Sequence, residues 1–170
     1  MGKEIVSTAT ALLPYPPERV WAVVTDLENW QWRSDLSRLE HTGENAFTEY
    51  DKSGFPTRFT VTDRRPASLW AFDIENVNLT GRWTGEFSPE GGGTRVVFTE
   101  LITPKRRWMR LFAKGYLRRQ QRRYLADLGR ALDQFFHLSA HKVIPPRMEE
   151  KPCLRRLSVR SAGGSADRGA

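Results

Sequence analysis

The feature that most constrains the fold of this chain is a series of short, similar segments between residues 36 and 104. Each segment is rich in threonine, valine and aromatic residues, and turn-forming residues such as Pro66 or the three glycines at 91–93 separate one segment from the next. The pattern predicts strands at residues 36–42, 46–50, 57–64, 68–76, 79–88 and 94–101. Because the connections are too short for crossover helices, we expect neighbouring strands to pair antiparallel.

The flanking segments complete the layout. Residues 5–13 predict one long strand that Pro14 ends, and Pro17 followed by Glu18 favours the start of a helix. A second short helical or turn segment at residues 28–36 carries two tryptophans. Residues 105–137 contain no proline and have a helical composition, which at 1.5 Å per residue gives a helix of about 50 Å.

An antiparallel sheet needs one face covered, and the long helix is the only predicted element large enough to cover it. We therefore predict an α+β fold in which six to seven antiparallel strands pack on a long C-terminal helix, with two short helices after the first strand. Residues 1–137 form one domain in this prediction. Residues 138–170 include Pro145 and Pro146 and show no periodic apolar pattern, which predicts a basic, mostly disordered tail.

Charge is divided unevenly along the chain, whose net charge is +7. Residues 1–104 hold 10 Lys/Arg against 15 Asp/Glu, residues 105–137 hold 10 against 2, and residues 138–170 hold 7 against 3. An acidic body with a basic C-terminal third suggests an anionic partner, such as a membrane surface. A nucleic acid is the less favoured partner because the chain has no known RNA-binding motif.

Several kinds of site and location are disfavoured. Cys153 is the only cysteine, so no intramolecular disulfide forms, and no Cys/His spacing indicates a metal site. The glycines at 91–93 are not followed by a helix or by Gly-Lys-Ser/Thr, so we read a hairpin turn there and expect no cofactor. The first residues lack the apolar stretch of a secretion signal, and no apolar run could span a bilayer, so we expect a cytoplasmic protein.

The long helix separates into two sides when its residues are projected at about 100° per residue. Arg107, Arg110, Lys114, Arg118 and Arg122 form a nearly straight cationic stripe on one side. The other side predicts the contact with the sheet, and its members are Met109, Phe112, Ala113, Tyr116, Leu117, Gln120, Tyr124, Leu128, Ala131 and Phe135.

Trp108 and Leu111 project near the cationic stripe. Exposed apolar residues beside arginines suit a membrane contact or a subunit interface. Together with the five cations of the stripe, these two residues are the candidates for surface binding.

Two glutamates occur in the same tripeptide, Phe-Thr-Glu, at residues 47–49 and 98–100. Strand alternation places each glutamate on the face of its phenylalanine. If those faces are interior, burial raises the carboxyl pKa toward values suited to acid–base catalysis, which makes Glu49 and Glu100 candidate catalytic residues. The alternative is that each glutamate pairs with an arginine such as Arg58 or Arg82.

Alternation also gathers aromatic residues on one face of the strands. Trp83 shares its face with Gly81 and Gly85. This small–large–small pattern either leaves room on the concave side of a curved sheet or lets the strand bend. An ordinary filled aromatic core is the alternative to a cavity.

The chain resembles the START-like (SRPBCC) superfamily in three stretches: PPERVWAVVTDLENWQWRSDL, FDIENVNLTGRWTGEFSPEGGGTRVVFTEL and YLRRQQRRYLADLGRAL. This superfamily includes the Bet v 1-like proteins and the polyketide cyclase/dehydrase and lipid transport group, and the likeness is to bacterial members without an assigned activity. The resemblance covers residues 3–137. It implies the helix-grip fold, in which a curved sheet wraps around the C-terminal helix and leaves a hydrophobic cavity between them.

The resemblance also implies a function, the binding of a hydrophobic or amphipathic small molecule such as a lipid, polyketide or quinone. A cyclase/dehydratase-type enzyme that uses a cavity carboxylate or tyrosine is one alternative, and a peripheral membrane- or RNA-associated protein is another. By resemblance alone, Trp32 is expected to help close the cavity mouth. The residues expected to bind the ligand are Trp32, Phe47, Phe59, Phe72, Trp83, Phe98, Phe112, Tyr116, Gln120 and Tyr124.

Overall fold

A computed structural model describes residues 4–141, with side chains up to residue 135. The elements follow in the order β1 (Ile5–Leu13), α1 (Pro17–Thr25), η1 (Trp30–Trp32), β2 (Leu36–Gly43), β3 (Ala46–Asp51), β4 (Pro56–Arg65), β5 (Leu69–Glu75), β6 (Leu79–Glu90), β7 (Gly93–Pro104), η2 (Arg107–Met109) and α2 (Arg110–His141). The predicted strands are confirmed. The long helix starts later than expected and continues past residue 137, and the predicted tail beyond residue 141 lies outside the described residues.

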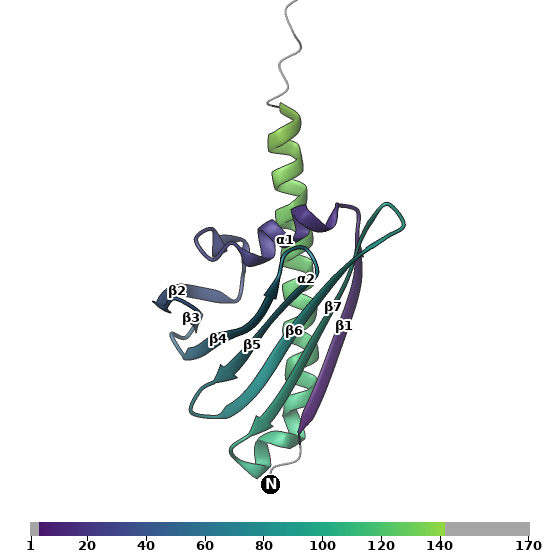
Figure 1. The fold of residues 1–170 in the computed structure, drawn as a ribbon. Helices are drawn as coiled ribbons and strands as arrows, with labels where there is room; N and C mark the ends of the chain where they lie inside the picture. The colour runs from purple at the N-terminus through teal and green to yellow at the C-terminus, as the bar shows by residue number, and fades with distance from the viewer. Residues whose placement is uncertain (1–3, 142–170) are drawn as a thin grey trace, which may run out of the picture.

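All seven strands form one antiparallel sheet in the order β1-β7-β6-β5-β4-β3-β2. Neighbours along the chain from β2 to β7 pair as hairpins, and β1 joins β7, with Ile5 opposite Ile102 and Leu13 opposite Thr94. The sheet curves, and α2 runs along one side of it, while α1 lies at one end of the sheet beside the middle of α2 (Figure 1). This arrangement is the predicted helix-grip fold.

The turn between β6 and β7 is the predicted hairpin turn. Glu90 pairs with Gly93, and the two residues between them, Gly91 and Gly92, have φ angles of 57° and 81°. These angles lie in the left-handed region, which glycine adopts without the steric penalty of other residues. A two-residue turn of this kind matches the twist of the strands on either side.

The core lies between the sheet and the helices. Inward-facing residues of β7, such as Val96 and Phe98, are buried against α1 residues such as Val20 and Val24. Pro17 occupies the first turn of α1, where a missing N–H costs nothing, and the Pro16 carbonyl accepts the N–H groups of Arg19 and Val20. α1 therefore starts where the sequence predicts and turns its apolar side to the sheet.

The buried side of α2 differs in part from the projected one. Leu117, Leu128 and Ala131 are buried as projected. Gln121, which the projection did not place on the sheet side, is also buried, whereas Phe112 and Tyr116, which were expected to contact the sheet, are 69% and 63% exposed. The Gln121 amide donates to the Ser7 carbonyl oxygen at 3.0 Å and accepts from the Ser7 hydroxyl at 2.8 Å. A polar side chain that is paired in this way is stable in a buried position, and a projection based on apolar residues cannot place it.

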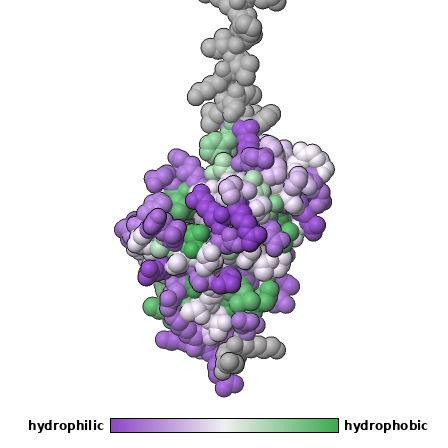
Figure 2. Space-filling view, viewed as in Figure 1, coloured by the Kyte–Doolittle hydropathy of each residue, from purple (hydrophilic) through white to green (hydrophobic). Residues whose placement is uncertain are grey.

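The surface in the view of Figure 2 is mostly hydrophilic, with apolar residues in separate small groups. Single exposed apolar residues such as Leu12 on β1 are ordinary for a protein surface. Within residues 4–141, no helix is long and apolar enough to cross a membrane.

Candidate functional site

A cavity lies between the sheet, the α1–η1 segment and α2. Its volume is about 80 Å³. That is room for several water molecules, whereas sites for drug-sized ligands commonly measure about 300 Å³ or more. The enclosed space therefore fits only part of a lipid- or polyketide-sized molecule. Six of the ten predicted ligand-binding residues line it: Trp32, Phe47, Phe59, Phe72, Trp83 and Tyr124.

The cavity is small because aromatic rings fill most of the interior. Phe72 and Trp83 stack with 4.8 Å between ring centroids, and Phe47 and Phe59 stack at 4.9 Å. A Cβ atom on Gly85 would overlap the Trp83 ring. Gly85 therefore makes room for the neighbouring indole, so the small–large–small pattern at this glycine does not create open space.

Trp32 lines the cavity on the η1 side. Its ring meets the Tyr124 ring edge to face, with 5.3 Å between centroids. Trp70 also lines the cavity, and its buried indole N–H has no hydrogen-bond partner in the described part of the chain. An unpaired buried N–H is costly unless an acceptor such as a ligand oxygen or a water reaches it.

An open groove lies next to the cavity, toward the start of α2, and we call it the side groove. Its volume is about 310 Å³, and Glu49 and Phe59 line both the cavity and the groove. Met109 and Tyr116 form its helical wall, and Asn78 in the turn between β5 and β6 lies among its other lining residues. The two spaces together reach the usual size of a small-molecule site.

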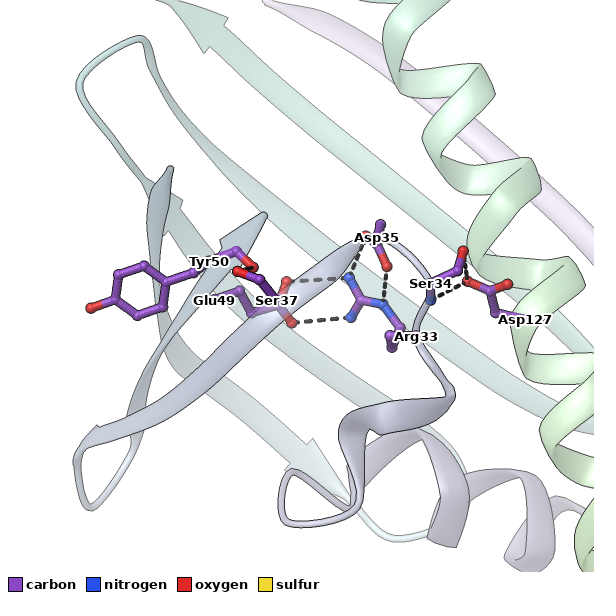
Figure 3. Close-up of polar contacts among 7 residues, drawn as sticks. All are labelled: Arg33, Ser34, Asp35, Ser37, Glu49, Tyr50 and Asp127. Carbon is purple, nitrogen blue, oxygen red and sulfur yellow. Dashed lines mark hydrogen bonds and ion pairs between the residues drawn. The ribbon is translucent and has the colours of Figure 1, made fainter. Parts of the chain in front are cut away.

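Arg33, Asp35 and Glu49 form a charged cluster at the edge of the cavity (Figure 3). The Arg33 guanidinium donates to the Asp35 carboxylate at 2.9 and 2.8 Å and to the Glu49 carboxylate at 3.1 and 3.3 Å. All three side chains are nearly buried, with 11–13% of each exposed. Burial acts to raise the pKa of Asp35, but its hydrogen bonds to Arg33 and the guanidinium charge outweigh burial and lower that pKa.

The guanidinium of Arg33 also lies over the Tyr124 ring, 4.8 Å from its centroid. Burial acts to lower the pKa of Arg33, but the charge of Glu49 and the contacts with Asp35 outweigh burial and raise that pKa. For the Tyr124 phenol, burial itself raises the pKa. Arg33 stays cationic and Tyr124 stays neutral at ordinary pH.

Asp127 on α2 holds the segment that carries Arg33. One oxygen of its buried carboxylate accepts the Ser34 N–H and the Ser34 hydroxyl, both at 2.8 Å (Figure 3). Its other oxygen accepts a hydrogen bond from Arg130. Arg33 itself follows η1 directly, and its N–H donates to the Trp30 carbonyl at 2.9 Å. These bonds position the charged cluster between η1 and α2.

Glu100 points inward from β7, between buried Phe98 and Ile102. It has no hydrogen-bond or ion-pair partner within residues 4–135. Burial and the nearby charge of Glu49 raise its pKa to about 7, with Arg33 opposing them. Near neutral pH a substantial fraction of Glu100 is therefore protonated. Glu100 is not among the residues that line the cavity or the side groove.

The two glutamates thus have different environments. The expected arginine partner is found for Glu49, but it is Arg33, not Arg58 or Arg82. Arg82 instead pairs with Asp73 on the exposed face. Sequence reasoning missed Arg33, Asp35 and Asp127. For Arg33 and Asp35, the only signal in the sequence was a charged stretch after two tryptophans. Asp127 lies in an arginine-rich helix, and no sequence pattern marks it as a functional residue.

The other four predicted ligand-binding residues lie outside the cavity wall. Phe98 is buried and packs edge to face on Tyr124 at 5.5 Å between centroids. Phe112 faces outward, Tyr116 lines the side groove, and Gln120 lines a further hollow of about 390 Å³ beside it. The placement of Phe112 as a cavity residue is wrong, because the pairing of Gln121 with Ser7 turns this residue away from the sheet.

The surface-binding candidates are mostly exposed. Trp108 and Leu111 are 60% and 82% exposed, and the side chains of Arg107, Lys114, Arg118 and Arg122 lie in water. Arg110 departs from the predicted stripe. It is half-buried, and its Nε has no partner within the described residues.

Among the residues that the structure describes, no group of three or more His, Cys, Asp or Glu side chains could hold a metal ion.

A curved antiparallel sheet, a long C-terminal helix and a space between them define the START-like, or Bet v 1-like, class of helix-grip proteins. The chain belongs to the polyketide cyclase / dehydrase and lipid transport family, whose model matches residues 4–133. No curated protein matches the sequence.

Solved structures share the fold at low sequence identity. A START superfamily protein from Mycobacterium smegmatis has a TM-score of 0.69 and 11% identity, and the match covers 76% of this chain and 98% of that one. A protein from Rhizobium leguminosarum has a TM-score of 0.63 and 19% identity, with 79% and 97% covered. Ara h 8.0201 has a TM-score of 0.61 and 12% identity, with 77% and 99% covered. At these identities the likeness concerns the fold alone.

Proposed function

We propose that this protein binds a neutral small molecule with an apolar, largely aromatic body and at least one hydrogen-bond acceptor, such as a carbonyl-bearing polyketide or quinone. The observation that carries the proposal is the unpaired indole N–H of Trp70, buried in the wall of an aromatic cavity. The N–H itself is covered by protein, so a carbonyl or hydroxyl oxygen in the cavity would reach it after a shift of the indole toward the cavity. The family's description, polyketide cyclase / dehydrase and lipid transport, is consistent with such a ligand.

Size determines how the ligand lies. The cavity of about 80 Å³ takes one end of the molecule, and the side groove of about 310 Å³ takes the rest. Phe59, which lines both spaces, would contact the ligand where it passes from one to the other. Aromatic walls favour flat rings, which pack on them with well-defined geometry.

Charge argues against an anionic ligand. Among the described residues, the side groove is lined by the carboxylates of Glu49 and Asp51 and by no cationic side chain. Arg33 in the cavity wall already binds two carboxylates. A fatty acid would bring its carboxylate beside these acids, and like charges at short distance are unfavourable.

Native mass spectrometry tests the proposal. The purified chain is incubated with a panel of aromatic polyketides, quinones and fatty acids, and we expect a 1:1 complex with neutral carbonyl-bearing aromatic compounds. Trp70→Phe removes the N–H, and we expect it to weaken binding by about tenfold, the value of one hydrogen bond. Trp83→Phe, in the same cavity wall, is the size-matched control and should weaken binding less. Equal affinities of the two variants, or no complex at all, would contradict the proposal.

A second candidate is a cyclase- or dehydratase-type reaction on the bound molecule. The observation in its favour is Glu100, an inward-pointing carboxyl behind the lining residues that lies close enough to Glu49 of the cavity wall for their charges to interact, and whose pKa of about 7 suits a general acid or base. If the protein is an enzyme that uses this group, Glu100→Gln purified from the same cells should retain a different molecule from the wild type, because the substrate is not turned over. Identical bound molecules in the two proteins would speak against catalysis by Glu100.

A further inference from the structure

A cluster of apolar side chains is exposed where α2 begins, and we call it the helix-start patch. It consists of Trp108, Leu111, Phe112 and Tyr116, which are 60%, 82%, 69% and 63% exposed. Leu111, Phe112 and Tyr116 lie on the first two turns of α2, and Trp108 lies in η2 directly before it. Four large apolar residues exposed together on one turn after another mark an interaction site rather than ordinary surface.

The charge around this patch is of one sign. Residues 105–126 include nine Lys/Arg and no Asp/Glu. Lys114, Arg118 and Arg119 lie on the first turns of α2 close to the patch, and all three are exposed. A helix that exposes Trp, Leu and Phe beside Lys and Arg matches the pattern of helices that lie in the interface of an anionic bilayer.

We propose that the helix-start patch docks this protein on an anionic membrane surface, with its apolar side chains among the lipid headgroups and its cations against lipid phosphates. The proposal does not depend on whether the cavity binds a ligand. The position of the patch also matters, because Tyr116 belongs to it and lines the side groove. Docking in this way would bring the open groove next to the lipid.

Two other possible binding partners fit the helix-start patch less well. A second copy of the chain would bring one cationic region against another. Residues 105–126 contain no acidic residue that could offset this repulsion. A nucleic acid would use the arginines but would leave the side chain of Leu111, the most exposed residue of the patch, in water. An anionic bilayer satisfies the apolar and the cationic groups together.

Flotation of the full chain with lipid vesicles tests the proposal. One set of vesicles contains phosphatidylcholine alone, and the other contains phosphatidylcholine with about one third phosphatidylglycerol. We expect the wild type to float with the anionic vesicles, to bind them less as salt increases, and to bind the neutral ones at least about tenfold less. Leu111→Ser/Phe112→Ser should lose about tenfold or more of the binding, because two interfacial anchors are removed.

Leu12→Ser is the matched control. Leu12 is 59% exposed on β1, at the end of that strand next to α1, so the same change there should leave flotation unchanged. Equal binding by wild type and Leu111→Ser/Phe112→Ser, or equal binding to both vesicle types, would overturn the proposal. It would also be overturned by binding to homopolymeric RNA without vesicle binding, or by a dimer in light scattering that Leu111→Ser/Phe112→Ser abolishes. Urea unfolding checks that Leu111→Ser/Phe112→Ser is folded. If its unfolding midpoint equals that of the wild type, a loss of flotation is due to lost membrane binding and not to unfolding.

Discussion

The carboxylate of Asp127, buried on α2, accepts two hydrogen bonds of 2.8 Å from Ser34, one from the backbone N–H and one from the hydroxyl. These bonds link residues far apart in the chain. They connect the C-terminal half of the long helix with the segment that carries Trp32 and Arg33, and so they hold one wall of the cavity in place. Because the carboxylate itself is buried, these hydrogen bonds take the place of the water that would otherwise solvate it.

We expect Asp127→Ala to lower the free energy of unfolding by about 2–3 kcal/mol, because it removes two hydrogen bonds from Ser34 to a charged acceptor. Urea unfolding monitored by circular dichroism measures this loss. Asp73→Ala is the matched control, since Asp73 pairs with Arg82 on the exposed face and should cost less than about 1 kcal/mol. A loss for Asp127→Ala no larger than that of the control would mean that the Ser34–Asp127 link does not stabilise the fold.

Gly85 gives a second prediction. A Cβ atom there would overlap the ring of Trp83, so Gly85→Ala forces the indole to move. We expect a destabilisation of about 1–3 kcal/mol and a change in the near-ultraviolet circular dichroism of the packed tryptophans. The same substitution at Gly115, where a Cβ meets nothing within 4 Å on the helix surface, should instead stabilise by up to about 1 kcal/mol. If both variants behave alike, Trp83 does not lie over Gly85.

Glu100 predicts a pH dependence of stability. Its pKa is about 7 in the folded protein against 4.5 in the unfolded chain, so between these values the folded state holds more protons. Stability therefore falls as pH rises from about 4.5 to about 7, and the full loss is on the order of 3 kcal/mol. Glu100→Gln should remove this loss and be more stable than the wild type at pH 8.

Urea unfolding of the wild type and Glu100→Gln at several pH values between 4.5 and 8 measures this effect as the difference between the two proteins. Glu86→Gln is the control, because Glu86 is exposed on β6 and should leave the pH profile unchanged. A constant difference between wild type and Glu100→Gln across this range would show that Glu100 titrates as an ordinary glutamate.

The contact of Arg33 with Glu49 predicts a measurable coupling energy. Both side chains are nearly buried and are joined by two hydrogen bonds, so a double-mutant cycle with Arg33→Ala and Glu49→Ala should give about 1–3 kcal/mol. The same cycle on Arg82 and Asp73, which are 59% and 54% exposed, should give less than about 1 kcal/mol. Equal coupling in the two pairs would mean that burial adds nothing to the Arg33–Glu49 contact.

Much of the fold could be predicted because it depends on local patterns. The alternation of apolar residues, the prolines at 14 and 17 and the glycines at 91–93 each act over a few residues, and the strands, the start of α1 and the β6–β7 turn lie where those patterns place them. The inward direction of Glu100 follows from the same alternation. Four of the predicted ligand-binding residues, Phe47, Phe59, Phe72 and Trp83, line the cavity for that reason.

Which side of α2 faces the sheet could not be predicted in this way. Gln121 occupies a buried position because Ser7 lies opposite it, and that pairing joins residues at the two ends of the domain. It turns Phe112 away from the sheet and leaves Tyr116 at the edge of the side groove, and both residues are exposed in the helix-start patch. The same holds for the charged cluster, in which Arg33 meets Glu49 across a turn and a strand.

The sequence by itself determined the secondary structure, the antiparallel topology and the family, because short-range periodicity and turn residues specify them. The tertiary structure alone decided that the aromatic residues nearly fill the interior, that Arg33 is Glu49's partner, and that part of the apolar side of α2 faces outward. These outcomes depend on distances between residues far apart in the chain. Such distances depend on how side chains of particular volume and hydrogen-bonding capacity fit together once the sheet and helix have met.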